Sequence, residues 1–337
     1  MKNAINYFYN INVDSLRMIG EDYYFFYDNK EFIFQKLKDF SLDYQSVFEL
    51  NKILIENNAM FFKIIPNQNN EIITNIADKK YVLLLNSNLY DRKFNYYDII
   101  KTNISISNSN KLINRLNRSN WVNMWENKID FFESFISQNI NKYLILNKYT
   151  NYFIGLGEVA ISYVKDTIKE EKPNYLDNLV VSHRRIDYSN LKQLYNPLYL
   201  IIDHRSRDVS EYLKKMFFDG EYVDIRECIN LANLSNYGAR LLMARMLFPS
   251  FFFDLFEKVL DDDAVEKEIL YLVDKMNDYE LFLLKIYNSL KDKNIPEINW
   301  IKKMDYSSTL TTPNTSGTSF ISIDSIPSLS VTSIMLQ

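Results

Sequence analysis

Both histidines of the chain, His183 and His204, lie in one short window of the sequence. Each belongs to a polar cluster that follows an aliphatic run, LVV or YLII, and such runs predict short buried strands. An Asn-Pro pair supplies a turn between them. Strands that end in polar residues present those side chains at one edge, so we expect His183, Asn190 and Asp203 to converge.

Two kinds of hydrolytic chemistry fit these residue types. A metal hydrolase would use His183, His204 and Asp203, but neighbouring residues on a strand point to opposite faces, and the helical spacing of many zinc ligands is missing. A Ser–His–Asp triad would take its nucleophile from Ser182 or Ser189, but the sequence has no nucleophile elbow of the GxSxG type.

Four arginines fall in the same window. A guanidinium fork matches phosphate or carboxylate groups. The cluster therefore predicts either a pocket that handles phosphate or an internal network of ion pairs, and the sequence leaves both open. The four residues are Arg184, Arg185, Arg205 and Arg207.

The composition excludes several classes of protein. The chain has 337 residues, is 47% hydrophobic and carries a formal net charge of −4. This length suggests about two domains or lobes, and the apolar content excludes a wholly disordered chain. A charge balance near neutrality argues against binding to nucleic acid, which needs a basic surface. The single cysteine, Cys228, excludes an internal disulfide and a multi-cysteine zinc site.

No targeting segment is apparent. The first residues lack the apolar core and cleavage site of a signal peptide. The longest apolar stretches fall short of the ~20 residues that a membrane helix needs. We therefore expect a cytoplasmic protein without membrane insertion.

Residues 1–86 are expected to form a small β-rich lobe with one helix. Alternating apolar residues predict the strands, and Ser41 is the expected helix cap. The expected elements are a hairpin of Asp22–Tyr27 and Glu31–Leu37, a helix from Ser41 to about Asn57, and strands at Phe61–Ile65, Ile72–Ile76 and Tyr81–Leu85.

Residues 87–305 are expected to be mainly helical. Pro249 should break the apolar segment Leu241–Phe256, and the run Asp261–Asp263 is expected to begin a helix rather than to bind metal. Residues 306–337, rich in Ser and Thr, are expected to be a flexible tail. One apolar stripe at helical spacing is expected to be core: Trp121, Trp125, Ile129, Phe132 and Ile136.

Several phrases of the sequence resemble a known family. SHRRIDYSNL is similar to the His-x-Asp-x-x-x-x-Asn loop of kinase-like phosphotransferases, and NPLYLIIDHRSRDVSEYL to the strand and metal-binding Asp that follow it. Together with the Trp121–Glu133 stretch, the YFIGLGEVAISYV helix and IPEINW, these phrases look closest to the YutH group of endospore coat-associated proteins, relatives of the CotS spore coat kinases. The resemblance covers about residues 10–303.

The resemblance implies an α+β, protein-kinase-like fold of two lobes, residues 1–86 and 87–305. It makes His183 the loop histidine, and Asn190 and Asp203 the metal ligands. ATP and Mg²⁺ are the implied cofactors if the pocket is open. The implied partners are spore coat proteins, and the implied location is the mother cell and the spore coat.

One position departs from the family pattern. The catalytic Asp is replaced by Arg185, and a guanidinium cannot accept the proton of an attacking hydroxyl. Arg185 would also repel Mg²⁺ and could pair with Asp203. Asp187 is the alternative base.

The nucleotide-binding side of the pattern is also incomplete. The 22–34 hairpin has no glycine to cover phosphates. The lysine that should anchor them corresponds to Gln35 or Lys36, with Glu49 as the expected helix partner. We expect a pseudokinase that acts as a binding or assembly module; an active ATP-dependent phosphotransferase on a small-molecule or protein hydroxyl is the alternative.

Overall fold

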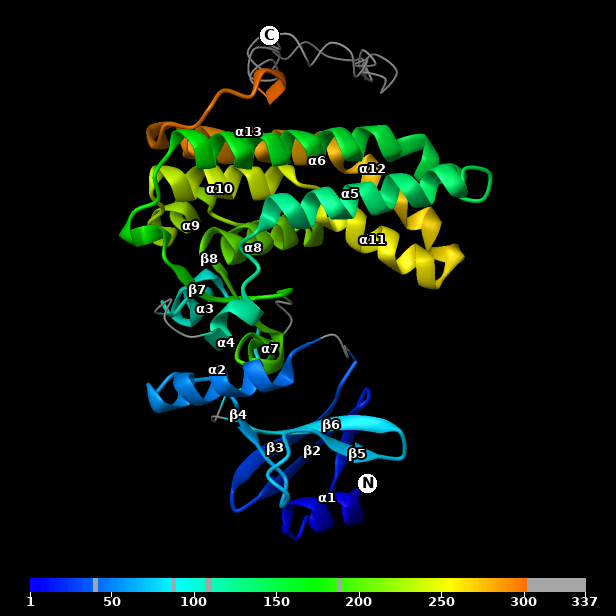
Figure 1. Cartoon of the computed structure of the whole chain (residues 1–337), viewed down its shortest axis with the longest axis vertical. Coiled ribbons are helices and arrows are strands. Elements are labelled where there is room, and N and C mark those ends of the chain that lie inside the picture. Colours follow the sequence, from blue (N-terminus) through cyan, green and yellow to red (C-terminus); the bar gives the residue numbers. More distant parts are fainter. Residues whose placement is uncertain (39–41, 87–88, 107–110, 187–189, 302–337) are drawn as a thin grey trace. The chain divides into compact units, whose positions relative to one another are not determined.

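The computed structural model describes residues 1–38, 42–86, 89–106, 111–186 and 190–301 (Figure 1). The chain divides into two compact units, Met1–Glu297 and Ile298–Gln337. All the strands and helices described below lie in the first unit. Both Asp187 and the tail expected from residue 306 lie outside the described residues.

An antiparallel sheet of six strands forms the N-terminal part of the first unit, with the order β1-β2-β3-β6-β4 and β5 paired to β6. The predicted β2–β3 hairpin is confirmed, with Tyr24 opposite Ile33. Asp28 and Asn29 have positive φ angles of 51° and 56°, as a tight hairpin turn requires. The strands are β1 (Arg17–Ile19), β2 (Asp22–Tyr27), β3 (Lys30–Lys36), β4 (Lys63–Ile65), β5 (Thr74–Ile76) and β6 (Lys79–Leu85).

The sheet region holds two helices, where the sequence predicted one. The additional helix is α1 (Lys2–Tyr9). Its Ile5 is fully buried in a cluster with Phe25 and Phe34 of the sheet. A helix of eight residues without a capping side chain is weak alone, so its packing against the sheet stabilises it.

The predicted helix after the first hairpin is α2 (Tyr44–Glu56), and its cap differs from the prediction. Asp43 caps it, because its Oδ1 accepts a hydrogen bond from the backbone N–H of Ser46 at 3.1 Å. Ser41, the expected cap, lies outside the described residues.

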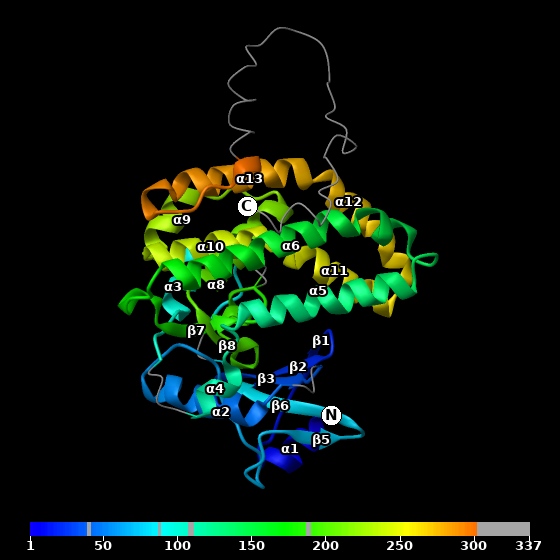
Figure 2. The ribbon, with the colours of Figure 1, turned by 45° about the horizontal axis from the view of Figure 1, so that its top comes forward.

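The rest of the first unit is mainly helical. The five-residue stripe is buried along one face of α5, which confirms the prediction. The α5–α6 hairpin is visible in Figures 1 and 2. A Cβ at Gly157 of α6 would lie 2.8 Å from Cδ1 of Ile129, so the end of the Ile129 side chain would have to shift to admit a larger residue. The helices include α3 (Tyr96–Thr102), α4 (Lys111–Leu116), α5 (Trp121–Gln138), α6 (Leu144–Glu170), α8 (Ser206–Asp219), α9 (Ile225–Ala232), α10 (Asn236–Leu247), α11 (Ser250–Asp261), α12 (Glu268–Asp274) and α13 (Met276–Ser289).

The predicted helix break at Pro249 is confirmed, since α10 ends at Leu247 and α11 begins at Ser250. Asp262 caps a short 3₁₀ helix, Asp263–Lys267, by accepting from the N–H of Ala264 at 3.0 Å. The acidic run therefore begins a helical segment, as predicted. Within the described residues, no helix has the length and apolar character needed to span a membrane.

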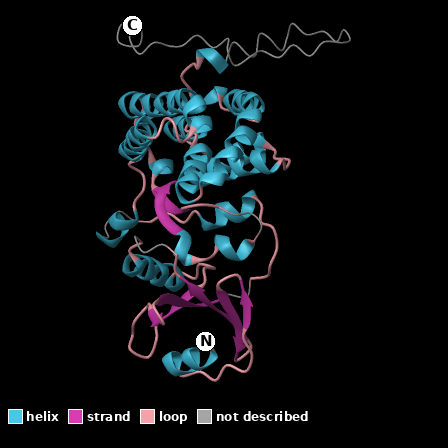
Figure 3. Cartoon of the chain, turned by 90° about the vertical axis from the view of Figure 1, so that its right-hand side faces the viewer, coloured by secondary structure: helices cyan, strands magenta, loops and turns pink. Residues whose placement is uncertain are grey.

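A two-stranded ribbon, separate from the large sheet, carries both histidines (Figure 3). Its strands are β7 (Leu179–His183) and β8 (Leu200–His204), and they are antiparallel. His183 lies opposite Leu200, whereas Asp203 lies opposite Val180. Because residues three apart on a strand face opposite sides, the side chains of His183 and Asp203 leave opposite faces. The predicted convergence of these two residues is wrong.

Candidate functional site

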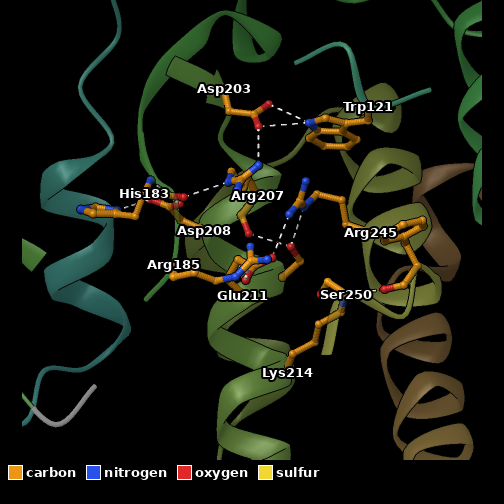
Figure 4. Close-up of polar contacts among 12 residues, drawn as sticks. Trp121, His183, Arg185, Asp203, Arg207, Asp208, Glu211, Lys214, Arg245 and Ser250 are labelled. Carbon is orange, nitrogen blue, oxygen red and sulfur yellow. Dashed lines mark hydrogen bonds and ion pairs between the residues drawn. The ribbon is translucent and has the colours of Figure 1, made fainter. Parts of the chain in front are cut away.

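The carboxylate of Asp203 is fully buried and already has several hydrogen-bond donors (Figure 4). The indole Nε1 of Trp121 donates to both oxygens at 2.9 and 3.0 Å. The backbone N–H of His204 donates to Oδ1 at 2.7 Å, and the guanidinium of Arg207 to Oδ2 at 3.0 Å. A metal ion at Asp203 would have to displace these donors.

Arg207, rather than Arg185, pairs with Asp203, so the pairing expected from the sequence is wrong. Arg207 follows Asp203 by four residues, which brings its guanidinium back onto the strand end. Arg185 instead donates to Asp254, and it lies 3.9 Å from Glu211. Burial opposes the charge of Arg185, but the two carboxylates outweigh this effect and raise its pKa.

Both ring nitrogens of His183 are engaged. Nδ1 lies 2.8 Å from Oδ2 of Asp208, and Nε2 donates to the carbonyl of Leu194 at 2.8 Å. His183 is 1% exposed. The ring therefore holds the end of β7 in place and has no nitrogen left to accept a proton from a substrate.

Asn190, the other predicted metal ligand, caps a short helix. Its Oδ1 accepts from the backbone N–H of Lys192 at 2.8 Å, at the start of α7 (Leu191–Leu194). In the part of the chain that is described, no three His, Cys, Asp or Glu side chains are grouped as metal ligands would be. With Asn190 used as a cap and Asp203 already bonded, these residues do not fit a Mg²⁺ site.

The two candidates for the phosphate-anchoring position, Gln35 and Lys36, lie on opposite faces of β3. Gln35 is buried; its Nε2 donates to the hydroxyl of Tyr199 at 3.1 Å, and its Oε1 accepts from Asn196 at 2.7 Å. Lys36 points to the other side of the strand and forms an ion pair with Glu21. Glu49, the expected helix partner, accepts from Gln45 of its own helix at 3.0 Å.

The sequence matches a family of spore coat proteins over most of its length. The family model described as "Spore coat putative kinase YutH" matches residues 2–286. The chain belongs to this YutH family. The endospore coat-associated protein YutH of Bacillus subtilis (strain 168) is 26% identical over 210 residues, which span 54% of this chain and 61% of that protein.

The fold of the YutH-family chain is similar to that of an aminoglycoside phosphotransferase. The aminoglycoside phosphotransferase of Alicyclobacillus acidocaldarius subsp. acidocaldarius DSM 446 superposes with a TM-score of 0.62. The two are 10% identical, and the match covers 87% of this chain and 97% of that chain. The predicted α+β, protein-kinase-like fold is thereby confirmed.

The hydrolytic alternatives are not supported by the geometry of this YutH-family chain. Asp203 and His204 point to opposite faces, as predicted from their adjacency: His204 lies 2.8 Å from Oγ of Ser206 and 3.2 Å from Oδ1 of Asp177. This His204 cluster is buried, which leaves no access for a substrate. Ser182 is buried without a hydrogen-bond partner among the described residues, and Ser189 lies outside them.

A network of buried charges continues from Arg207 along α8 (Figure 4). Burial raises the pKa of Glu211, but nearby cations, first Arg185 and Arg245, outweigh it and lower that pKa to about 2. Burial lowers the pKa of Lys214 to about 7. Arg207 therefore belongs to an internal network of ion pairs, which Arg185, with a side chain 51% exposed, joins through Asp254 and Glu211.

Sequence reasoning missed the two side chains that bind Asp203. The periodicity predicts that Trp121 belongs to the core stripe, and it does. Periodicity says nothing, however, about which group accepts a hydrogen bond from the indole N–H. The four-residue spacing of Asp203 and Arg207 does not predict their ion pair, because Asp203 lies on β8 and Arg207 on α8, and this spacing brings side chains together only along one helix.

Proposed function

We propose that this YutH-family chain is a pseudokinase that serves as a binding or assembly module of the spore coat. The observation that carries the proposal is the buried carboxylate of Asp203, bonded by Trp121, the His204 N–H and Arg207. Phosphotransfer in kinase-like folds depends on metal ions bound by an aspartate at this position. A carboxylate that already pairs with an internal cation is a poor metal ligand.

Two further features support the loss of phosphotransfer. Arg185, at the place of the proton acceptor, is a cation with no acceptor atom. Gln35, at the inward-facing position of β3, is neutral and is bonded to Asn196 and Tyr199. A nucleotide would therefore find neither a base nor a cationic anchor at these positions.

The relative named for endospore coat association suggests where such a module acts. We infer that other coat proteins are its partners and that it reaches the coat from the mother cell. We also retain the predicted lobes, residues 1–86 and 87–305, as part of this proposal.

The test is a thermal-shift titration of the full chain with millimolar Mg²⁺ and ATP, because a ligand that binds the native state raises Tm. We expect no shift in the wild-type chain, and no transfer of labelled phosphate to added hydroxyl compounds or to itself. A shift that Asp203→Ala abolishes would overturn the proposal, since it would show nucleotide bound through that carboxylate.

A further inference from the structure

Three oxygen atoms surround the guanidinium of Arg207. Nε donates to the carbonyl of His183 at 2.8 Å, and one terminal nitrogen donates to the carbonyl of Arg184 at 3.0 Å. The other terminal nitrogen donates to Oδ2 of Asp203 at 3.0 Å. Arg207 is only 8% exposed, so this group of oxygens is satisfied almost entirely from within the chain.

These three oxygens can be bound by one positive group, and the carboxylate among them needs a compensating charge. Carboxylate and backbone carbonyl oxygens are the ligands that hard divalent cations take in proteins, and a buried carboxylate is costly without a compensating charge. We propose that the guanidinium of Arg207 is a built-in replacement for a divalent cation, holding together oxygen atoms of Asp203, His183 and Arg184.

The position of Arg207 in the fold explains how the replacement is held. Arg207 lies in the first turn of α8, and the next residue, Asp208, accepts from the backbone N–H of His183 at 3.0 Å. The start of α8 thus supplies both a donor and an acceptor to the end of β7. The positive charge arrives with the folded chain and does not depend on ions in solution.

The experiment compares the Tm of the full-length wild-type chain and the Arg207→Ala variant with and without millimolar Mg²⁺ or Mn²⁺. We expect Arg207→Ala to lower Tm and either metal to restore part of the loss, while the wild-type Tm stays unchanged. Adding Asp203→Asn to the variant should abolish the recovery, because a neutral amide then replaces the only carboxylate among the three oxygen donors.

The matched control is Arg240→Ala. Arg240 is also buried; it donates to the carbonyl of Asn294 at 2.9 Å and to Glu170 at 2.8 Å, away from the ribbon. Recovery by metal in this control, or none in Arg207→Ala, would overturn the inference.

Two further measurements keep the inference testable if Arg207→Ala does not fold. Arg207→Ala can be refolded with and without metal, and a chain that refolds in neither case also counts against the inference. Arg207→Lys keeps one positive charge, so we expect a smaller loss of Tm and no metal response; a metal response there would contradict the inference.

The inference rests on the proposed function, since it requires that Asp203 does not hold a nucleotide-bound metal in the native chain. The two can fail separately. Binding of Mg²⁺ and ATP by the wild-type chain that Asp203→Ala abolishes overturns the proposed function. A wild-type chain that binds no nucleotide, together with an Arg207→Ala variant that ignores metals, overturns only the inference.

Discussion

Trp121 contributes to two parts of the structure at once. Its ring stacks on Trp125 with centroids 5.6 Å apart and lies 4.6 Å from the guanidinium carbon of Arg245. Its N–H donates to both oxygens of Asp203. The ring belongs to the core stripe, and the N–H belongs to the candidate site, so one side chain couples the packing of α5 to the carboxylate.

Trp121→Phe should separate these two contributions, because phenylalanine keeps an aromatic ring but has no N–H. Losing a donor to a buried carboxylate costs about 1.5–3 kcal/mol of unfolding free energy. Urea denaturation measures the loss. The matched control is Trp125→Phe, which removes a similar ring area from between Trp121 and Phe248. Equal losses in the two variants would show that the hydrogen bonds to Asp203 add nothing.

Arg185→Asp restores the residue type that the family pattern places there. We expect no phosphotransfer from this variant, because Asp203 would remain bonded to Arg207 and Trp121. We also expect a lower Tm, because the new carboxylate would face Asp254 and Glu211, the present partners of Arg185. A phosphotransfer assay and a melting curve check the two outcomes. Measurable activity would contradict the view that the occupied Asp203 is the deciding loss.

At the scale of elements, α8 carries charged residues on a face that is buried. Asp208, Glu211 and Lys214 follow one another at three-residue spacing, Arg207 lies four residues before Glu211, and all four are buried. Such a face is normally solvated. Here Arg207 and Asp208 have partners from the ribbon, and Glu211 has Arg245 of α10. Lys214 donates to the carbonyl of Phe248 at 2.8 Å, at the break between α10 and α11.

Lys214 should make stability depend on pH. Burial lowers its pKa to about 7, from 10.5, so between these values the unfolded chain binds more protons and stability rises with pH. A full difference of one proton corresponds to about 1.4 kcal/mol per pH unit. Urea denaturation between pH 7 and pH 9 should show this rise in the wild-type chain and a flatter profile in Lys214→Met. If the unfolding free energies of the two chains changed with pH in the same way, the pH dependence would not come from Lys214.

At the scale of the first unit, the segment between Asn190 and Leu200 ties the sheet to the ribbon. Lys192 donates to Glu31 of β3 at 2.9 Å, and Asn196 and Tyr199 bond Gln35. The backbone N–H of Phe62 donates to the carbonyl of Tyr195 at 3.0 Å. Moving the sheet away from this segment would break these bonds together, which favours one fixed arrangement of the sheet and the ribbon.

A double-mutant cycle on Lys192 and Glu31 tests this link. Their side chains are only 12% and 19% exposed, so we expect a coupling free energy within the range of about 0.5–3 kcal/mol found for contacting residues. The control is Lys93 with Glu221, an ion pair with side chains 75% and 51% exposed, where we expect less than about 1 kcal/mol. A larger coupling free energy for Lys93 and Glu221 than for Lys192 and Glu31 would contradict the view that the latter pair ties the sheet to the ribbon.

Periodicity and turn residues determined much of the local structure. The hairpin at Asp28-Asn29, the α5 stripe and the break at Pro249 follow from patterns within a few residues, and the structure has all three. The helix α1 escaped prediction because its stability comes from the sheet beneath Ile5, which is distant in sequence. The predicted cap of α2 differs from the observed one by two residues, because the side-chain oxygens of Ser and Asp can both accept a capping hydrogen bond.

The sequence by itself determined the family resemblance, the presence of Arg185 where that resemblance places an aspartate, and the strands that carry His183 and Asp203. Only the tertiary structure decided which side chains meet. The register of β7 and β8 sends His183 and Asp203 to opposite faces, and α5 brings Trp121 to a carboxylate far along the chain. Arg207 forms an ion pair with Asp203, and Arg185 forms one with Asp254, because each guanidinium pairs with the carboxylate that the fold places near it.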